Sequence, residues 1–205
     1  MKLYFRPFAC SLAARIALEE AGLDAEFVEV PRDGTLPDGR AFTEISPMGY
    51  VPAIETSGGF TLTEGPAVLT YIAELAPEGM LNFTGFSDAH YRMLGWLNFT
   101  STELHKAVFA PILGSGFSDG EQDAARVRAA RPFAVLTRHL EASEFLGDRF
   151  SVADAYLLAV LNWCEFSKVP IADWPVLLAY RERLRARPSV AQAMAAELPL
   201  LSRAA

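Results

Sequence analysis

Cys10 is one of only two cysteines in the 205-residue chain, and it lies where a thiol could do chemistry. It follows the strand-like segment 2–5 and precedes a segment in which Leu12, Ile16 and Ala17 recur at helical spacing. The N–H groups and the positive dipole end of a helix start favour a thiolate over a thiol. We expect Cys10 to be either a reactive thiol, with a pKa below the usual value of about 8.5, or a small buried core residue.

The second cysteine, Cys164, lies in the apolar segment 155–166. Burial there would raise its pKa and block access of reagents. The separation of the two cysteines fits neither a C-x-x-C motif nor the ligand spacing of a zinc site. We therefore expect no disulfide and no metal site.

Two turns in the first half of the chain could face a ligand. A cis peptide bond before Pro52 would leave the Val51 N–H and C=O groups available to an extended ligand, although an ordinary edge proline is the simpler interpretation. Glu64 and Gly65 begin a helical segment, where amide groups could bind a carboxylate and Glu64 an ammonium group. A glutamate at that place also simply complements the helix dipole.

A histidine in the second half lies among polar residues. Asn98, Thr102 and His105 are spaced as i, i+4 and i+7, which predicts a polar stripe along a helix. His105 could donate a hydrogen bond to a ligand from this stripe. A structural histidine fits the same pattern equally well.

These residues must be positioned by two halves of different character. Up to about residue 76, strand-like and helical segments follow one another in the order β-α-β and then β-β-α, which predicts a small mixed sheet with helices. The expected strands lie at 2–5, 25–30, 52–56 and 60–63, and the expected helices begin near residues 12 and 64.

Residues 77–88 lack periodicity and are predicted to be a linker, and only helical patterns follow them. Helices are expected at about 89–113, 119–142, 151–167, 174–187 and 189–196. Ser151 and Asp154 have the spacing of a capping box, with Phe150 available as a hydrophobic staple. The predicted fold class is an α/β domain followed by an all-α domain.

Composition and charge limit the function classes. With 51% hydrophobic and 21% charged residues, the chain can bury a core. A formal net charge of −7 offers no basic surface to nucleic acid. No uncharged apolar run approaches the roughly 20 residues that a membrane-spanning helix needs, so we expect no membrane partner and a cytoplasmic location.

Taken in order, five segments resemble the cytosolic glutathione transferases, and within them the bacterial beta class. They are Cys10–Ser11 and the stretches 49–53, 62–68, 96–106 and 147–157. The similarity runs over essentially the whole chain. It implies a thioredoxin-like domain over residues 1–78, an all-helical domain over residues 88–205, a homodimer, and glutathione as co-substrate in the cleft between the domains.

The resemblance also assigns roles in the first half of the chain. Cys10 corresponds to the cysteine that contacts, or forms a mixed disulfide with, the glutathione sulfur. Val51, before a cis-Pro52, corresponds to the backbone partner of the cysteinyl moiety. Glu64 and Gly65 correspond to the pair that binds the γ-glutamyl end.

In the second half, the resemblance implies that helix residues complete the glutathione site: Asn98, Thr102, Glu103, Leu104 and His105. Cys10 and His105 are the expected stabilisers of the glutathione thiolate. Ser151 and Asp154 correspond to a capping box that serves folding and is not catalytic.

Two departures from the family pattern concern the glycyl end of glutathione. The family often carries a lysine in the loop near position 35, where Thr35 is the nearest counterpart and the loop is one residue shorter. Met48 stands where a lysine is also frequent. We expect weaker attraction for the glycyl carboxylate.

The implied activity is attack of the glutathione thiolate on a hydrophobic electrophile. Apolar side chains expected to line the electrophile side of the site are Phe8, Phe109, Ile112, Phe117 and Trp163. One alternative is a thiol-disulfide oxidoreductase that uses Cys10, with glutathione itself resolving the mixed disulfide. The other is a non-catalytic protein that binds glutathione or another ligand, against which the retention of Cys10, Glu64 and His105 argues.

Overall fold

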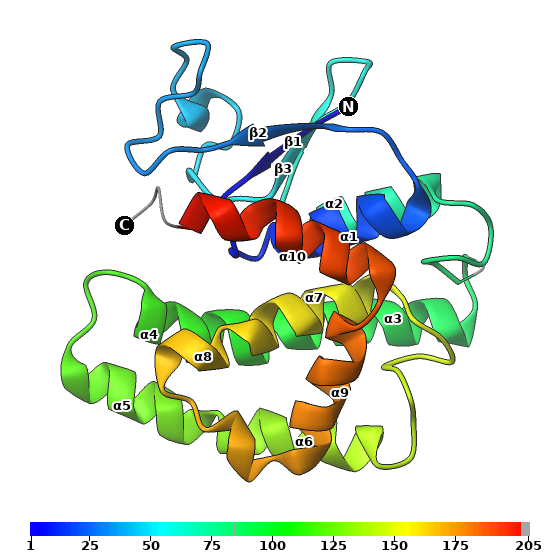
Figure 1. The fold of residues 1–205 in the computed structure, drawn as a ribbon, viewed down its shortest axis with the longest axis vertical. Helices are drawn as coiled ribbons and strands as arrows, with labels where there is room; N and C mark the ends of the chain where they lie inside the picture. Colours follow the sequence, from blue (N-terminus) through cyan, green and yellow to red (C-terminus); the bar gives the residue numbers. More distant parts are fainter. Residues whose placement is uncertain (84, 202–205) are drawn as a thin grey trace. The chain divides into compact units, whose positions relative to one another are not determined.

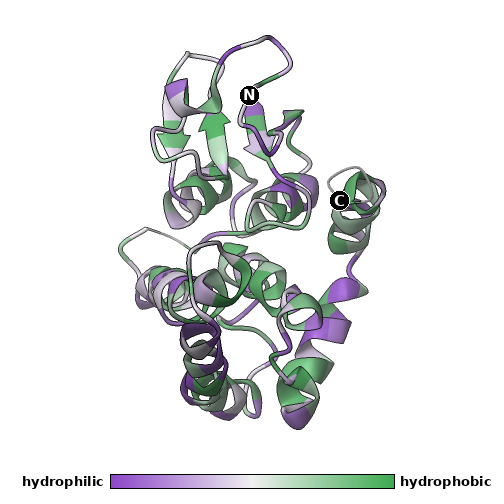
Figure 2. Ribbon diagram, turned by 90° about the vertical axis from the view of Figure 1, so that its left-hand side faces the viewer, coloured by the Kyte–Doolittle hydropathy of each residue, from purple (hydrophilic) through white to green (hydrophobic). Residues whose placement is uncertain are grey.

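The computed structural model describes residues 1–83 and 85–201. The chain forms two compact units (Figure 1). The first unit comprises Met1–Asn82 and the C-terminal helix α10 (Pro188–Leu201), and the second comprises Phe83–Ala186. Hydrophobic residues occur on the helices of both units, as a buried core in each requires (Figure 2).

The first unit is built on a four-stranded mixed sheet with strand order β2-β1-β3-β4. β1 (Lys2–Phe5) pairs in parallel with β2 (Glu26–Glu29) and antiparallel with β3 (Ala53–Glu55). β4 (Thr61–Thr63) pairs antiparallel with β3. The strands lie where the sequence predicted them, because each is bounded by turn residues close to it in the chain.

Two helices cover one face of this sheet: α1 (Leu12–Ala21) and α2 (Gly65–Leu75) (Figure 1). Gly22 ends α1 with φ of 63°, a left-handed conformation that suits glycine. A short 3-10 turn, η1 (Phe42–Glu44), lies in the connection between β2 and β3. α10 packs against α1 and so completes this unit.

The second unit consists of helices in its described part. They are α3 (Asp88–Phe99), η2 (Thr100–Phe109), α4 (Ala110–Leu113), α5 (Asp119–Arg128), α6 (Ala130–Leu140), α7 (Val152–Asn162), α8 (Cys164–Ser167), η3 (Ile171–Asp173) and α9 (Pro175–Arg185). Every residue of α7 is buried, which is typical of a helix at the centre of a core.

The start of α7 confirms the predicted capping box. Asp154 accepts hydrogen bonds from the Ser151 N–H at 2.9 Å and from the Ser151 hydroxyl at 3.0 Å, and the Ser151 hydroxyl accepts one from the Ala153 N–H. Asp154 also accepts from the Leu146 N–H and the Tyr180 hydroxyl, each at 2.8 Å. These four bonds satisfy a fully buried carboxylate whose pKa burial raises.

Four of the expected helices differ from the structure. The segment 89–113 is not one α-helix, because a π-helix, η2, separates α3 from α4. The segment 119–142 divides at Ala129, one turn before Pro132, whose missing N–H cannot bond the preceding turn. The segment 151–167 divides at Trp163, and the last helix extends beyond 189–196 to Pro188–Leu201.

The division into units also differs from the expected one at the end of the chain. The sequence-based division placed all residues from 88 onward in one helical domain, whereas α10 groups with the first unit because it packs along α1. Within residues 1–83 and 85–201, no helix combines the length and apolar character that spanning a bilayer requires.

Candidate active site

Cys10 lies in the turn between β1 and α1 and is half-buried, so it is not a core residue. Its thiol donates a hydrogen bond to the Val51 carbonyl oxygen at 3.1 Å. Ser11, the N-cap residue of α1, closes the turn, because its hydroxyl oxygen lies 3.2 Å from both the Arg6 N–H nitrogen and the Arg6 carbonyl oxygen. The turn therefore brings the candidate thiol beside the chain segment that precedes β3.

The Val51–Pro52 peptide bond is cis, as the sequence resemblance implied. Its surroundings differ from the expectation in one respect, because the Val51 carbonyl is not left to a ligand but accepts the Cys10 thiol. A glutathione backbone that used the same carbonyl would therefore release the Cys10 thiol.

Glu64 and Gly65 lie together at the start of α2, as predicted. Glu64 is exposed and takes the N-cap position, but its side chain makes no capping bond, and its carbonyl accepts the Val68 N–H at 2.9 Å. Its φ of 71° is rare for a residue with a side chain. Such a conformation costs about 1–3 kcal/mol and is common at ligand sites, so it supports a binding role for this carboxylate.

Thr35 is exposed in the connection between β2 and β3 and pairs with Ala41 in an isolated bridge. Its N–H donates to the Asp33 carboxylate at 2.9 Å. A carboxylate this close opposes a second carboxylate, such as the glycyl end of glutathione. The Asp33 carboxylate therefore weakens the attraction of this loop for the glycyl carboxylate.

The polar residues of the second unit do not form the expected stripe. Asn98 and Thr102 are exposed, and the Thr102 hydroxyl lies 3.1 Å from both the Asn98 carbonyl and the exposed Glu103 carboxylate. His105 is instead half-buried and faces α7. The prediction of a stripe used the residue spacing of an α-helix. η2 instead has i→i+5 hydrogen bonds, such as Ala110 N–H to His105 C=O, and these change the direction in which each side chain points.

Leu104, which was expected to help complete the site, has a fully buried side chain. Only its backbone could reach a ligand. The same holds for Phe109, which was expected to line the electrophile side and is instead a fully buried core residue, while Ile112 and Trp163 are also buried. Of the apolar set, only Phe8 and Phe117 keep substantial exposed surface.

His105 is held by aromatic residues. Its Nδ1 lies 2.8 Å from the Tyr156 hydroxyl, and its ring meets the Trp163 ring edge-on with centroids 4.8 Å apart. Burial, with a smaller contribution from the Lys106 charge, lowers the pKa of His105 to about 4. At neutral pH this side chain is therefore an uncharged imidazole, which can offer a hydrogen bond but not a positive charge.

Tyr156, the hydrogen-bond partner of His105, was not predicted from the sequence. The available signal was its hydroxyl in an otherwise apolar helix, since a buried tyrosine oxygen needs a partner. The structure thus brings Cys10 together with Val51 in the first unit and His105 together with Tyr156 in the second. Within the described ranges, no three His, Cys, Asp or Glu side chains gather as metal ligands.

The chain matches known proteins over nearly its whole length. Residues 9–75 match the family described as glutathione S-transferase, N-terminal domain, and residues 119–183 match its C-terminal domain. Glutathione S-transferase GstA of Escherichia coli O157:H7 is 34% identical over 96% of this chain and 98% of its own.

Two solved structures are similar at a TM-score of 0.91, covering 96% of this chain and 98% of theirs. One is a sphingomonad glutathione S-transferase complexed with glutathione, at 39% identity, and the other is the beta class enzyme of Sphingomonas chungbukensis, at 38% identity. The chain belongs to the glutathione S-transferase family and, within it, to the bacterial beta class.

Proposed function

We propose that this protein is a glutathione transferase that binds reduced glutathione and directs its thiolate at a hydrophobic electrophile. The observation that carries the proposal is the 3.1 Å contact between the Cys10 thiol and the Val51 carbonyl before a cis proline. The two groups proposed to meet the cysteinyl part of glutathione thus lie side by side. The glutathione complex of the 39% identical neighbour supports the same ligand.

In the first unit, we assign recognition of glutathione to backbone and carboxylate groups. Val51 pairs with the cysteinyl backbone, and the exposed Glu64 carboxylate binds the γ-glutamyl ammonium group. The Gly65 N–H at the start of α2 binds the γ-glutamyl carboxylate. Thr35 is left with a neutral hydrogen bond to the glycyl end.

In the second unit, we assign stabilisation of the sulfur to His105. Where the Tyr156 hydroxyl donates to Nδ1, the imidazole carries its proton on Nε2 and can donate it to a thiolate. Asn98, Thr102 and Glu103 are exposed polar neighbours, and Leu104 contributes backbone only. Phe8 and Phe117 are the candidate apolar contacts of the electrophile.

Thiol-disulfide exchange is the second candidate activity, favoured by the half-buried Cys10. The Cys10 thiolate would attack the glutathione sulfur of a mixed disulfide between glutathione and a substrate thiol, so that a Cys10–glutathione disulfide forms and the substrate thiolate leaves. Reduced glutathione would then attack the Cys10–glutathione disulfide, restore Cys10 and release oxidised glutathione. Cys164 is buried and offers no resolving thiol.

Homodimer assembly and a cytoplasmic location belong to the same proposal. Three large apolar side chains of the first unit, Met48, Tyr50 and Phe60, are exposed, and a partner subunit would cover them. The net charge of −7 and the resemblance to cytosolic enzymes support a cytoplasmic protein. Sedimentation at micromolar concentration tests the dimer, and a 22.4 kDa species would contradict it.

The activity is tested by turnover with 1-chloro-2,4-dinitrobenzene and glutathione. Wild type should form the conjugate, which absorbs in the near ultraviolet. The Cys10→Ala variant should conjugate more slowly but not at zero rate, because His105 and backbone N–H groups still stabilise the thiolate. Glutathione binding without turnover toward any of several electrophiles would instead favour the non-catalytic alternative.

A further inference from the structure

The turn that carries Cys10 is tied to the far end of the chain by one carboxylate. Glu197 of α10 accepts the Phe8 N–H through Oε2 at 2.7 Å and the Arg15 Nε–H through Oε1 at 3.0 Å. Its side chain is fully buried. Both oxygens are therefore engaged by α1 and by the turn before it.

Phe8 is the residue of the turn whose backbone conformation depends on such a hydrogen bond. Its φ of 54° lies in the left-handed region, which is unfavourable for an aromatic residue. Phe8 precedes Cys10 by two residues, and the turn is otherwise closed by the Ala9 N–H to Arg6 C=O bond at 3.1 Å and by the contacts of the Ser11 hydroxyl with the Arg6 backbone. Without an acceptor for its N–H, Phe8 would lower its conformational energy by adopting a common backbone conformation. That change would also move Cys10.

Arg15 fixes the carboxylate in place. It is buried on α1, with its guanidinium 4.6 Å from the Phe5 ring centroid and 3.7 Å from that of Phe27. Removing one member of a buried ion pair leaves the other charge uncompensated. Glu197 therefore has a single well-defined position from which to hold Phe8.

Further contacts hold the rest of α10 on α1. Glu20 accepts from both Arg187 and Ser189, and Gln192 donates to Glu19 at 2.6 Å. These contacts lie at the other end of α1 from Cys10. They anchor α10 without touching the Cys10 turn, and they supply a matched control.

We propose that Glu197 is a positioning residue for Cys10, and that α10 sets the exposure and placement of this thiol through the Phe8 N–H. The inference rests on the proposed role of Cys10 in glutathione chemistry. Its physical content, the placement of a thiol by a carboxylate from α10, can be measured without glutathione.

The test is alkylation of each cysteine by iodoacetamide in Glu197→Gln, quantified by peptide mass spectrometry. A glutamine has one acceptor oxygen and places an NH2 donor where the second carboxylate oxygen was, so the paired contact with Phe8 and Arg15 is broken. The turn should then open, and Cys10 should react at least about threefold faster. Cys164 should react at its wild-type rate. The control Glu20→Gln removes an α10 anchor of similar chemistry and should leave both rates unchanged.

Two outcomes overturn the proposal: a Cys10 rate in Glu197→Gln that matches wild type, or an equal rise at both cysteines, which reports general unfolding. A rise at Cys10 alone in Glu197→Gln, together with a wild type that binds no glutathione, would keep the positioning role and overturn the proposed function. If Glu197→Gln does not fold, NMR of the Phe8 amide in wild type tests the proposal instead. Slow hydrogen exchange and a downfield proton resonance support the tie to Glu197, and exchange at the rate of an open loop refutes it.

Discussion

Cys164 begins the short helix α8 and is 5% exposed, whereas Cys10 lies two residues before α1 and is half-buried. Burial raises the pKa of Cys164 to about 12, although the nearby Arg181 charge acts in the opposite direction. A helix start and a cation are therefore not sufficient to activate a thiol. Access to solvent and the loss of hydration decide which cysteine can react.

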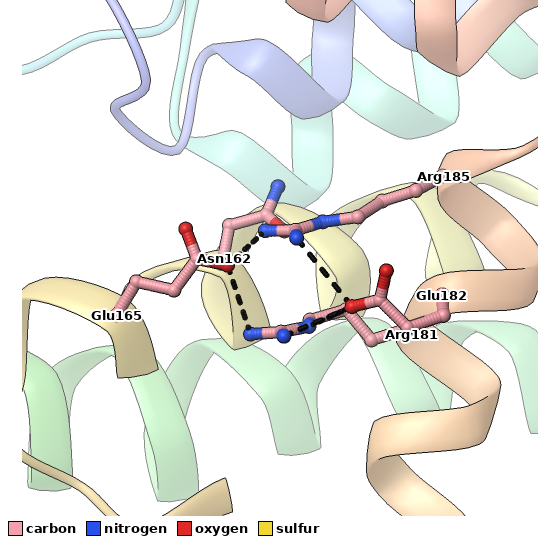
Figure 3. Close-up of polar contacts among 5 residues, drawn as sticks. All are labelled: Asn162, Glu165, Arg181, Glu182 and Arg185. Carbon is pink, nitrogen blue, oxygen red and sulfur yellow. Dashed lines mark hydrogen bonds and ion pairs between the residues drawn. The ribbon is translucent and has the colours of Figure 1, made fainter.

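The surroundings of the two cysteines differ in the same way. A polar network lies beside Cys164 (Figure 3). It joins Asn162 of α7 and Glu165 of α8 to three residues of α9: Arg181, Glu182 and Arg185. Its drawn contacts join side chains to one another. Cys10, in contrast, bonds directly to a backbone carbonyl of the proposed ligand site.

The largest effect is expected from a substitution that destabilises the helical unit containing Cys164. Asp154→Ala removes the capping box and leaves the buried Leu146 N–H and Tyr180 hydroxyl without their acceptor. We expect a loss of about 3–5 kcal/mol in the free energy of unfolding, measured by urea denaturation. Cys164 should then label faster than in wild type, and a loss below about 1 kcal/mol would contradict the role of the capping box.

The next effect concerns the proposed ligand site of Cys10. Glu64→Gln removes a charge-assisted contact and should weaken glutathione binding by about 1.5–3 kcal/mol in calorimetry. Glu74→Gln, an exposed change near the other end of α2, is the control and should bind as wild type does. Equal affinity of wild type and Glu64→Gln would remove Glu64 from the site.

A pH effect of about 1–2 kcal/mol should come from His105, which contacts the neighbour of Cys164. Its folded pKa of about 4 is lower than the unfolded value of 6.5. Its contribution to stability is therefore complete above pH 6.5 and is lost as the pH falls toward 4.

The measurement for His105 compares urea unfolding of wild type and His105→Asn at pH 7 and pH 5. Wild type should lose more stability between these values than the variant does, because asparagine does not titrate. Parallel losses in both proteins would show that His105 is not the group responsible.

The smallest effect is expected in the polar network beside Cys164. Glu165 is exposed, and its ion pair with Arg185 at 2.8 Å is accessible to solvent. Glu165→Gln should cost less than about 1 kcal/mol in stability. Cys164 should remain unlabelled, because burial protects it, and rapid labelling in this variant would show that the network does so instead.

Contacts close in the chain could be predicted from the sequence, and distant ones could not. Ser151 and Asp154 are three residues apart, so their capping box has a sequence pattern. Glu197 and Phe8 are 189 residues apart, and nothing near either of them indicates the bond. The strands and the start of α1 followed the predictable kind of signal, whereas the cis proline was implied only by the resemblance to the family.

The predicted polar stripe of the candidate site was wrong, because side-chain packing overrode the helical periodicity. Helical spacing predicted a polar stripe that included His105, but η2 is π-helical and holds this half-buried side chain against Tyr156 and Trp163. Leu104 and Phe109 are fully buried. η2 packs against α7, a contact that no local pattern in η2 reports.

The central claim is that Cys10, and not Cys164, is the thiol of the glutathione site. Folded protein incubated with oxidised glutathione and analysed by peptide mass spectrometry tests it most directly. We predict a glutathione adduct on Cys10 alone, absent in Cys10→Ala and retained in Cys164→Ala. An adduct on Cys164 alone, or no adduct on either cysteine, would contradict the claim.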